Sequence, residues 1–427
     1  MEVDSVLDHG TRDARISITA SPNPLVKRSL NINDEPLLLT KLQMTERSYW
    51  EFFFLTLACF STYASMFFFQ RHVSQKCQLD HGDILFGVFM SFLPMGNLLF
   101  RLIHNVLLSF WTPRHRLCFS MFLMAFVEVC LFSIFFFQER MYLWQVAVLY
   151  GLAGAGIGNF EANLLNVTTP YGPKAKLNSL LAIPIGIATI TVFSLPLMLY
   201  LDWEYPTYIY LFVCVLQFIG IILLVTRIPI AQLARQGTSA SHFFQYLGEW
   251  RAWFPQIIHY AMSMGANMFS VSMFSPGLLL YIFTDPTIVL NFFNRFEFSL
   301  RREYYFSCFS TLFAIGDFYG RKFFAKRQFK NPYTYWVFTV PGVAFGLSKI
   351  PSLSLFAGIF IAFGNGGIYT SSAKNIDAKI DSKYNGIAGS VWLFIADMWS
   401  VAAYILTQLF RDILIPPHET VFIGYSL

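Results

Sequence analysis

The stretch FAIGDFYGRKFF, Phe313–Phe324, places an acid and a base within a run of aromatic residues. Asp317 and Arg321 are four residues apart, so a helix puts their side chains on one face. Charged side chains inside a bilayer are costly and are typical of functional sites. Whether this stretch crosses a membrane therefore decides both the fold of the chain and the meaning of the pair.

The composition indicates an integral membrane protein. Of 427 residues, 55% are hydrophobic, only 13% are charged, and 48 are Phe. Soluble domains carry about 25% charged residues, and a soluble chain this apolar would expose large apolar patches. The net charge of +5 is explained by basic residues in the loops of a membrane protein, so we expect no nucleic-acid partner.

The cysteines and the local motifs point to no disulfide, metal or cofactor. Five of the six cysteines fall in apolar runs, where a free thiol behaves as a small hydrophobic group. The chain contains neither a CxxC nor an HExxH pattern. No early apolar core is present, so we expect no cleavable signal peptide.

Eleven apolar runs are candidates to cross a bilayer, which takes about 20 mostly apolar residues, and nine to twelve spans fit the sequence. The sequence therefore predicts an all-α, polytopic membrane protein. The predicted spans are residues 49–69, 84–110, 117–137, 142–167, 178–201, 206–226, 253–283, 304–325, 333–348, 351–373 and 385–413.

The basic residues set the predicted orientation. With a cytoplasmic N-terminus, most of the 30 lysines and arginines fall in cytoplasmic segments, as the positive-inside rule requires. Residues 1–48 are polar and are expected to form a disordered cytoplasmic tail. A cytoplasmic linker, 228–252, divides an N-terminal bundle, 49–227, from a C-terminal bundle, 253–413. Residues 414–427 then form a short extracytoplasmic tail.

Six charged residues fall inside the predicted spans. A set of this size more often lines a water-filled cavity or a proton relay than forms structural pairs alone. Glu161 and Asp397 are the candidate proton carriers, because an intramembrane carboxylate can take up and release a proton. The six residues are Arg101, Glu128, Glu161, Asp317, Arg321 and Asp397.

Two further stretches carry structural expectations. The glycines of GLAGAGIGNFEANLL, Gly151–Leu165, are expected to let helices approach closely. The run NFFNRFEFSLRREYYF, Asn291–Phe306, mixes bases and aromatics. It is expected to be an interfacial loop whose aromatics lie at headgroup level.

Four stretches resemble motifs of the equilibrative nucleoside transporter family, in the same order. GDFYGRKFF resembles the D-x-x-G-R signature of its eighth span, and MFSPGLLLYIF, Met273–Phe283, resembles the Phe-Pro motif of the seventh. AFGNGGIYTSS, Ala362–Ser372, resembles the Asn-Gly motif of the tenth span. Residues 384–410 resemble the small-residue eleventh span.

The resemblance is good from about residue 265 to 413 and faint from 49 to 227. Eleven spans, a cytoplasmic N-terminus and a linker between spans six and seven also match the family. The Pro-Trp-Asn stretch of the family's first span has no counterpart in Cys59–Phe69. Ala314 stands where the family often has Asn.

The resemblance implies a major-facilitator-like bundle of six plus five spans around a central site. It implies facilitated or proton-coupled transport of nucleosides or nucleobases, by alternating access. Asp317 and Arg321 would hold the sugar hydroxyls, with Asn365 of the tenth-span motif as a third substrate-binding residue. The chemistry agrees, since a carboxylate accepts from a diol and a guanidinium donates to it. The alternative for the pair is mutual neutralisation, with Arg321 serving partly as a snorkelling anchor.

Aromatic side chains are the candidates for stacking on a base. Trp392 and Tyr369 are two such residues. The sequence does not choose between them and the many other aromatics of the spans.

Two other classes of protein stay open. One is a non-nucleoside lysosomal membrane protein of related fold, similar to the battenin family. The other, less favoured, is an integral membrane enzyme. No loop exceeds about 25 residues, and His104 and His259 stand alone in the sequence, so we expect no enzyme.

A sorting signal is expected near the N-terminus. DEPLLL contains Asp34, Leu38 and Leu39 in the acidic dileucine pattern, which clathrin adaptors read as an address for endosomes and lysosomes. The alternative location is the plasma membrane. The expected partners are thus a small-molecule substrate, the lipid bilayer, protons and a clathrin adaptor.

Overall fold

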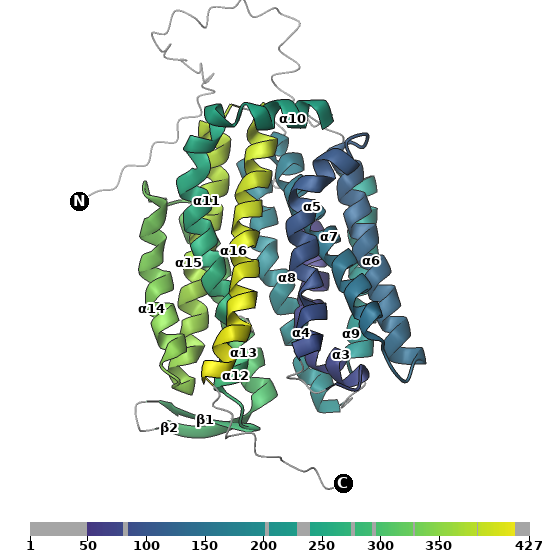
Figure 1. Ribbon diagram of the computed structural model, residues 1–427, viewed down its shortest axis with the longest axis vertical. Coiled ribbons are helices and arrows are strands. Elements are labelled where there is room, and N and C mark those ends of the chain that lie inside the picture. The colour runs from purple at the N-terminus through teal and green to yellow at the C-terminus, as the bar shows by residue number, and fades with distance from the viewer. Residues whose placement is uncertain are drawn as a thin grey trace, which may run out of the picture. The chain divides into compact units, whose positions relative to one another are not determined.

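Long helices run alongside one another through most of the chain (Figure 1). Helix α10, Ala240–Gly248, lies across one end of these helices, and a β-hairpin lies at the other. We call these the α10 end and the hairpin end. The computed structural model describes residues 49–79, 84–200, 205–228, 240–274, 278–292, 296–327, 329–381 and 383–414.

The N-terminal half is built from the first six predicted spans. Helix α2 packs on α8 and α9, and α7 packs on α5 and α6. The elements are α2 (Trp50–Phe68), α3 (Gln70–Lys76), α4 (Ile84–Met90), α5 (Phe92–Leu107), α6 (Pro113–Phe137), α7 (Leu143–Thr168), the 3-10 turn η3 (Thr169–Tyr171), α8 (Pro173–Tyr200) and α9 (Tyr205–Thr226).

The C-terminal half follows α10 and contains the hairpin. Helix α15 packs on α13 and α14, and α11 packs on α16. The elements are α11 (Trp250–Ser272), α12 (Leu278–Ile282), β1 (Thr287–Phe292), β2 (Phe296–Arg301), α13 (Arg302–Phe324), the 3-10 turn η7 (Pro332–Tyr335), α14 (Trp336–Leu347), α15 (Pro351–Lys379) and α16 (Asn385–Leu414).

The two halves meet along two helix pairs. Helix α8 packs against α13, and α5 packs against α16. Figure 1 places the helices of the N-terminal half (blue) on one side of the bundle and those of the C-terminal half (green and yellow) on the other. The interior between the halves is therefore lined by helices of both.

The predicted spans are confirmed as helices, and the all-α, polytopic fold class with them. Eight helices of the described residues are long and apolar enough to cross a membrane. Helices α11, α13 and α14 occupy the remaining three predicted spans. Helix α14 has only 12 residues, and α13 carries several charged residues. The count of eleven spans stays a prediction.

Three local expectations differ from the structure. The predicted linker contains a helix, α10, and the predicted span 253–283 is divided into α11 and α12. The expected interfacial loop is instead an antiparallel hairpin, β1–β2, followed by the first turn of α13. Ile288 and Leu290 are buried, whereas Val289 between them is exposed. This alternation has the period of a strand.

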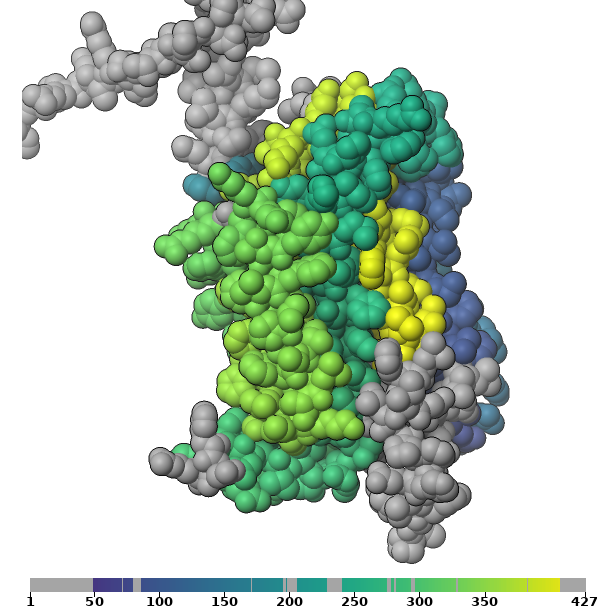
Figure 2. Space-filling model, turned by 60° about the vertical axis from the view of Figure 1, so that its left-hand side comes forward, coloured from purple at the N-terminus to yellow at the C-terminus, as the bar shows by residue number. Residues whose placement is uncertain are grey.

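The outer faces of the bundle are apolar. Figure 2 shows the face on which α14, α11 and α16 lie, in light green, teal and yellow. On α14, Val337 is 66% exposed and Val340 is 61% exposed. Exposed apolar residues on a chain with this many spanning helices are expected to face lipid.

Glycines bring two pairs of helices into close contact. On α7, a Cβ at Gly158 would lie 3.0 Å from the Oδ1 atom of Asn97 on α5. On α13, a Cβ at Gly320 would lie 3.0 Å from the Cα atom of Phe363 on α15. The expected close approach of glycine-bearing helices is thus confirmed at α7.

Replacing Gly320 with leucine should destabilise the C-terminal half. The added side chain meets the backbone of α15, which has no room to move, and such overpacking costs about 1–3 kcal/mol. Thermal unfolding of the detergent-purified protein measures the loss. Gly248→Leu is the matched control, since a Cβ there meets nothing within 4 Å; equal melting temperatures for the two variants would refute the close packing.

Candidate functional site

A cavity of about 230 Å³ lies between the two halves. Eight helices contribute to its lining: α2, α5, α7 and α8 from the N-terminal half, and α11, α13, α15 and α16 from the C-terminal half. Helices of both halves thus enclose one cavity. Its charged residues form two clusters joined by a tyrosine.

The first cluster is built on α13. The Nε atom of Arg321 donates to the Oδ2 atom of Asp317 at 2.8 Å, and both residues are at most 3% exposed. Asn365 of α15 donates to the other oxygen, Oδ1, at 3.3 Å. Asn267 of α11 donates to Asn365 at 3.0 Å and accepts from Thr339 of α14. A hydrogen-bonded chain across four helices thus holds the Asp317 carboxylate in place.

The second cluster centres on Arg101 of α5. Its Nη2 atom lies 2.5 Å from Oε2 of Glu161 on α7, and its Nε atom lies 2.6 Å from Oδ2 of Asp397 on α16. All three residues are buried. Because α5 and α7 belong to one half and α16 to the other, this arginine ties the halves together.

Tyr369 of α15 connects the two clusters. Its hydroxyl donates to Oε1 of Glu161 across the interface of the halves. The guanidinium of Arg321 lies over its ring, with Cζ 4.5 Å from the centroid, a cation–π contact that gains strength away from water. Tyr369 therefore touches both the α7 acid and the α13 base.

The charges of the cavity do not balance. Among the described residues that line it are three carboxylates, Asp317, Glu161 and Asp397, and two guanidiniums, Arg101 and Arg321. With every group ionised, one negative charge is left over, and a buried charge is strongly unfavourable. A proton or a cationic group of a substrate would neutralise it.

Each guanidinium also keeps an unused donor. Within the described part of the chain, the Nη1 atoms of Arg101 and Arg321 are buried without a hydrogen-bond partner. A buried donor without an acceptor costs about 1–3 kcal/mol. A bound molecule carrying oxygen acceptors would relieve that cost.

The rest of the lining is mostly apolar, with a few polar side chains such as Thr191, Ser272 and Ser400, and it extends toward the hairpin end. On α2 it runs from Phe60 to Phe68, and on α16 from Leu393 to Tyr404. Phe67 and Tyr404 stack across the halves at this end of the cavity, with centroids 6.4 Å apart. The charged residues therefore form the floor of the cavity, inside the bundle. Its aromatic walls extend from this floor toward the hairpin end.

The structure brings the predicted site residues together in this one cavity. Asp317, Arg321, Asn365, Glu161 and Asp397 all line it, although their roles in binding and proton transfer stay predictions. Arg321 is 2% exposed and pairs inside the bundle, so it does not snorkel toward a membrane surface. The predicted sorting signal lies outside the described residues.

One intramembrane acid of the sequence belongs elsewhere. Glu128 of α6 accepts from Ser65 of α2 at 2.8 Å, inside the N-terminal half. It does not line the cavity. The six charges of the spans thus divide into five at the central site and one within a bundle.

Sequence reasoning missed the bridging role of Arg101 and the presence of Asn267. Arg101 was visible as a base within a span, but its partners lie 60 and 296 positions away. Asn267 was visible only as an amide in the apolar stretch of α11. Neither position carries a local motif that names its partner.

Comparisons with known proteins show which solved structures have a similar fold. No protein-family model matches the chain, and no curated protein matches its sequence. The E. coli fucose:proton symporter FucP matches 86% of this chain and all of its own at 14% identity, with a TM-score of 0.56. The nucleoside transporter NupG matches 86% of this chain and 98% of its own at 12% identity, with a TM-score of 0.54.

A third structure agrees with these two. A POT family transporter in complex with a thioalcohol-conjugated peptide matches 85% of this chain and 90% of its own, at 11% identity and a TM-score of 0.56. At such identities the likeness concerns the fold alone. The chain has a major-facilitator-like fold.

Proposed function

We propose that the protein is a membrane transporter that moves nucleosides or nucleobases by alternating access. The observation that carries the proposal is the central cavity, which both halves line and whose floor holds the buried Asp317–Arg321 pair. A buried ion pair without a ligand is a weak source of stability. Its place in a cavity between two bundles favours a role in binding.

The chemistry of the floor suits a sugar. Each oxygen of the Asp317 carboxylate already accepts one hydrogen bond and has capacity for a second. The unused Nη1 donor of Arg321 would serve a hydroxyl of the same diol. The aromatic walls toward the hairpin end would then receive the base by stacking.

Alternating access would proceed by rocking of the two halves. At the floor of the cavity, polar contacts cross between them: Arg101 with Asp397, and Tyr369 with Glu161. A substrate that takes over some of these hydrogen bonds would weaken the ties between the halves. Loading of the site would thereby favour the change of conformation.

The proposed orientation follows from the positive-inside expectation. The α10 end would face the cytoplasm, and the hairpin end would face the outside or the lumen of an organelle. The cavity would then be in contact with the extracytoplasmic side. The membrane is either the plasma membrane or that of endosomes and lysosomes.

Proton coupling is the finer form of the proposal. Arg101 is shared by Glu161 and Asp397, so a proton on either acid restores neutrality. Uptake should therefore rise as the extracytoplasmic pH falls, because protonation then accompanies loading. Asp397→Asn, a neutral mimic, should remove this pH dependence, and initial uptake rates between pH 5.5 and 8 would measure it. A flat profile in the unmodified protein would rule out coupling.

A substrate panel tests the proposed function. Cells that lack nucleoside uptake would express the chain and receive radiolabelled adenosine, uridine, hypoxanthine and uracil. Uptake of at least one above the empty-vector control is the expected result. No uptake of any, in cells that hold the protein at their surface, would favour the battenin-like alternative or an enzyme.

A further inference from the structure

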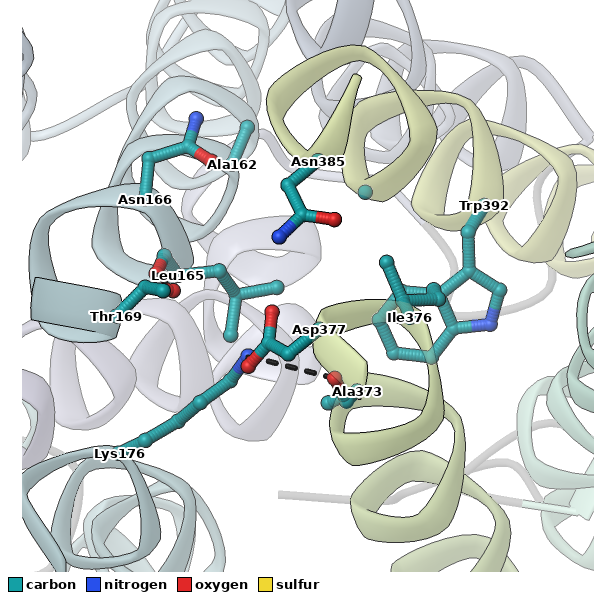
Figure 3. Close-up of a pocket in the computed structure, with 11 residues that line it drawn as sticks. Ala162, Leu165, Asn166, Thr169, Lys176, Ala373, Ile376, Asp377, Asn385 and Trp392 are labelled. Carbon is teal, nitrogen blue, oxygen red and sulfur yellow. Dashed lines mark hydrogen bonds and ion pairs between the residues drawn. The ribbon is translucent and has the colours of Figure 1, made fainter. Parts of the chain in front are cut away.

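A second, much smaller cavity lies nearer the α10 end. Its volume is about 20 Å³, room for a water molecule, and Figure 3 shows the side chains around it. The N-terminal half contributes the end of α7, Thr169 of the turn η3, and Lys176 of α8. The C-terminal half contributes the end of α15 and the start of α16.

The same helix faces line both cavities. On α15, Asn365 and Tyr369 line the central cavity, whereas Ala373 and Asp377 line the small one, all at intervals of four residues. On α7, Glu161 is followed in the same way by Leu165 in the small cavity. Residues four apart share a helix face, so the two cavities lie along one continuous surface.

Two aromatic rings stand between the cavities. The Tyr369 and Trp392 rings meet edge to face with centroids 5.1 Å apart. Tyr369 lines the central cavity and Trp392 lines the small one, and Trp392 is fully buried. The pair therefore joins the lining of one cavity to the lining of the other.

An ion pair closes the small cavity itself. Lys176 of α8 bonds to the Asp377 carboxylate of α15 and donates to the Ala373 carbonyl at 3.4 Å. Figure 3 draws the lysine reaching from one half toward the end of α15 on the other. Because the partners belong to different halves, rocking the halves apart at this end must break the pair.

Two of the described residues that line the small cavity carry a polar atom without a hydrogen-bond partner. Within the described residues, Oδ1 of Asn385 and Nε1 of Trp392 are buried without hydrogen-bond partners. Both residues line the cavity, but Figure 3 shows the Asn385 side chain among the other lining residues and the ring nitrogen of Trp392 turned away from them. The free acceptor of Asn385 suits an uncharged molecule that carries hydroxyl or amide donors.

We propose that the small cavity is the collapsed inner opening of the substrate path. The Tyr369–Trp392 pair and the Lys176–Asp377 pair are the two barriers that hold it shut, and Asn385 contacts an uncharged polar solute as it leaves toward the α10 end. The inference does not depend on the identity of the substrate. It requires only that the halves rock.

Gly389 offers a direct reporter of this opening. It lines the small cavity, and a Cβ at this position meets no atom within 4 Å. A cysteine placed there should react slowly with N-ethylmaleimide while the barriers are closed. Asp377→Asn, nearly the same shape, should raise the initial labelling rate about 5- to 10-fold, the lower end of typical couplings between states. The charge-swapped double variant Lys176→Asp with Asp377→Lys should return the rate to that of the intact pair.

Two controls accompany the full-length, detergent-purified protein. The chain without Gly389→Cys gives the background of the six native cysteines, and Gly248→Cys on the exposed α10 should label at one rate throughout. If the ion-pair variants do not fold, rising salt on the Gly389→Cys protein replaces them, because salt screens a partly exposed pair. Equal Gly389→Cys rates with and without the ion pair, or at low and high salt, would overturn the inference even if the protein transports nucleosides.

Discussion

Replacing Arg101 with methionine is expected to abolish transport and to cost about 3–5 kcal/mol of unfolding free energy. The reason lies in the two carboxylates that share this one guanidinium, Glu161 at 2.5 Å and Asp397 at 2.6 Å. Without the arginine, both acids are left in a buried site with no cation bonded to them. Thermal unfolding in detergent and initial uptake rates measure the two effects.

A charge-neutral variant separates stability from function at this site. The triple variant Arg101→Met, Glu161→Gln and Asp397→Asn removes all three charges together, so it should recover most of the stability and none of the transport. Arg251→Met is the matched surface control, because Arg251 is exposed at the start of α11. If Arg101→Met melts at the same temperature as Arg251→Met, the three residues do not form the buried bridge described here.

Replacing Asp317 with asparagine should lower uptake by about 100-fold while the protein still folds. The asparagine keeps the shape of the side chain and its bond from Asn365, but it removes the charge that pairs with Arg321 at 2.8 Å. It also removes an acceptor for a sugar diol. Initial uptake rates at equal surface expression measure the loss.

A second carboxylate outside the cavity supplies the control for this substitution. Asp285 is exposed in the loop before β1, so Asp285→Asn should leave uptake unchanged. Arg321→Lys should behave like Asp317→Asn, since a lysine lacks both the Nε donor to Asp317 and the planar guanidinium that covers the Tyr369 ring. Full uptake by either cavity variant would mean that the pair neutralises itself and binds nothing.

The helices and the Asp317–Arg321 pair were within reach of sequence reasoning. Apolar runs of about 20 residues fix where helices form in a membrane chain. The pair needs only the spacing of four on one helix, and the structure has this contact within α13. A contact of this kind can be predicted because both of its residues lie on one helix, four positions apart.

Contacts between helices that are far apart in the sequence could not be predicted from it. The sequence offers Glu161 and Asp397 as separate proton carriers, and no residue near either of them in the sequence indicates that they share Arg101.

The hairpin was not predicted for another reason. Its strands, Thr287–Phe292 and Phe296–Arg301, sit among aromatics and bases that also fit an interfacial loop, and only the burial of Ile288 and Leu290 against the helices reveals the alternation.

Counterflow in proteoliposomes tests the central claim most directly. Vesicles that contain the purified protein would be loaded with unlabelled adenosine or uridine and diluted into a trace of the same labelled nucleoside. We predict a transient accumulation of label with the unmodified protein and none with Asp317→Asn, because exchange through the central cavity needs that carboxylate. No accumulation with any nucleoside or base, or equal accumulation with Asp317→Asn, would contradict the account.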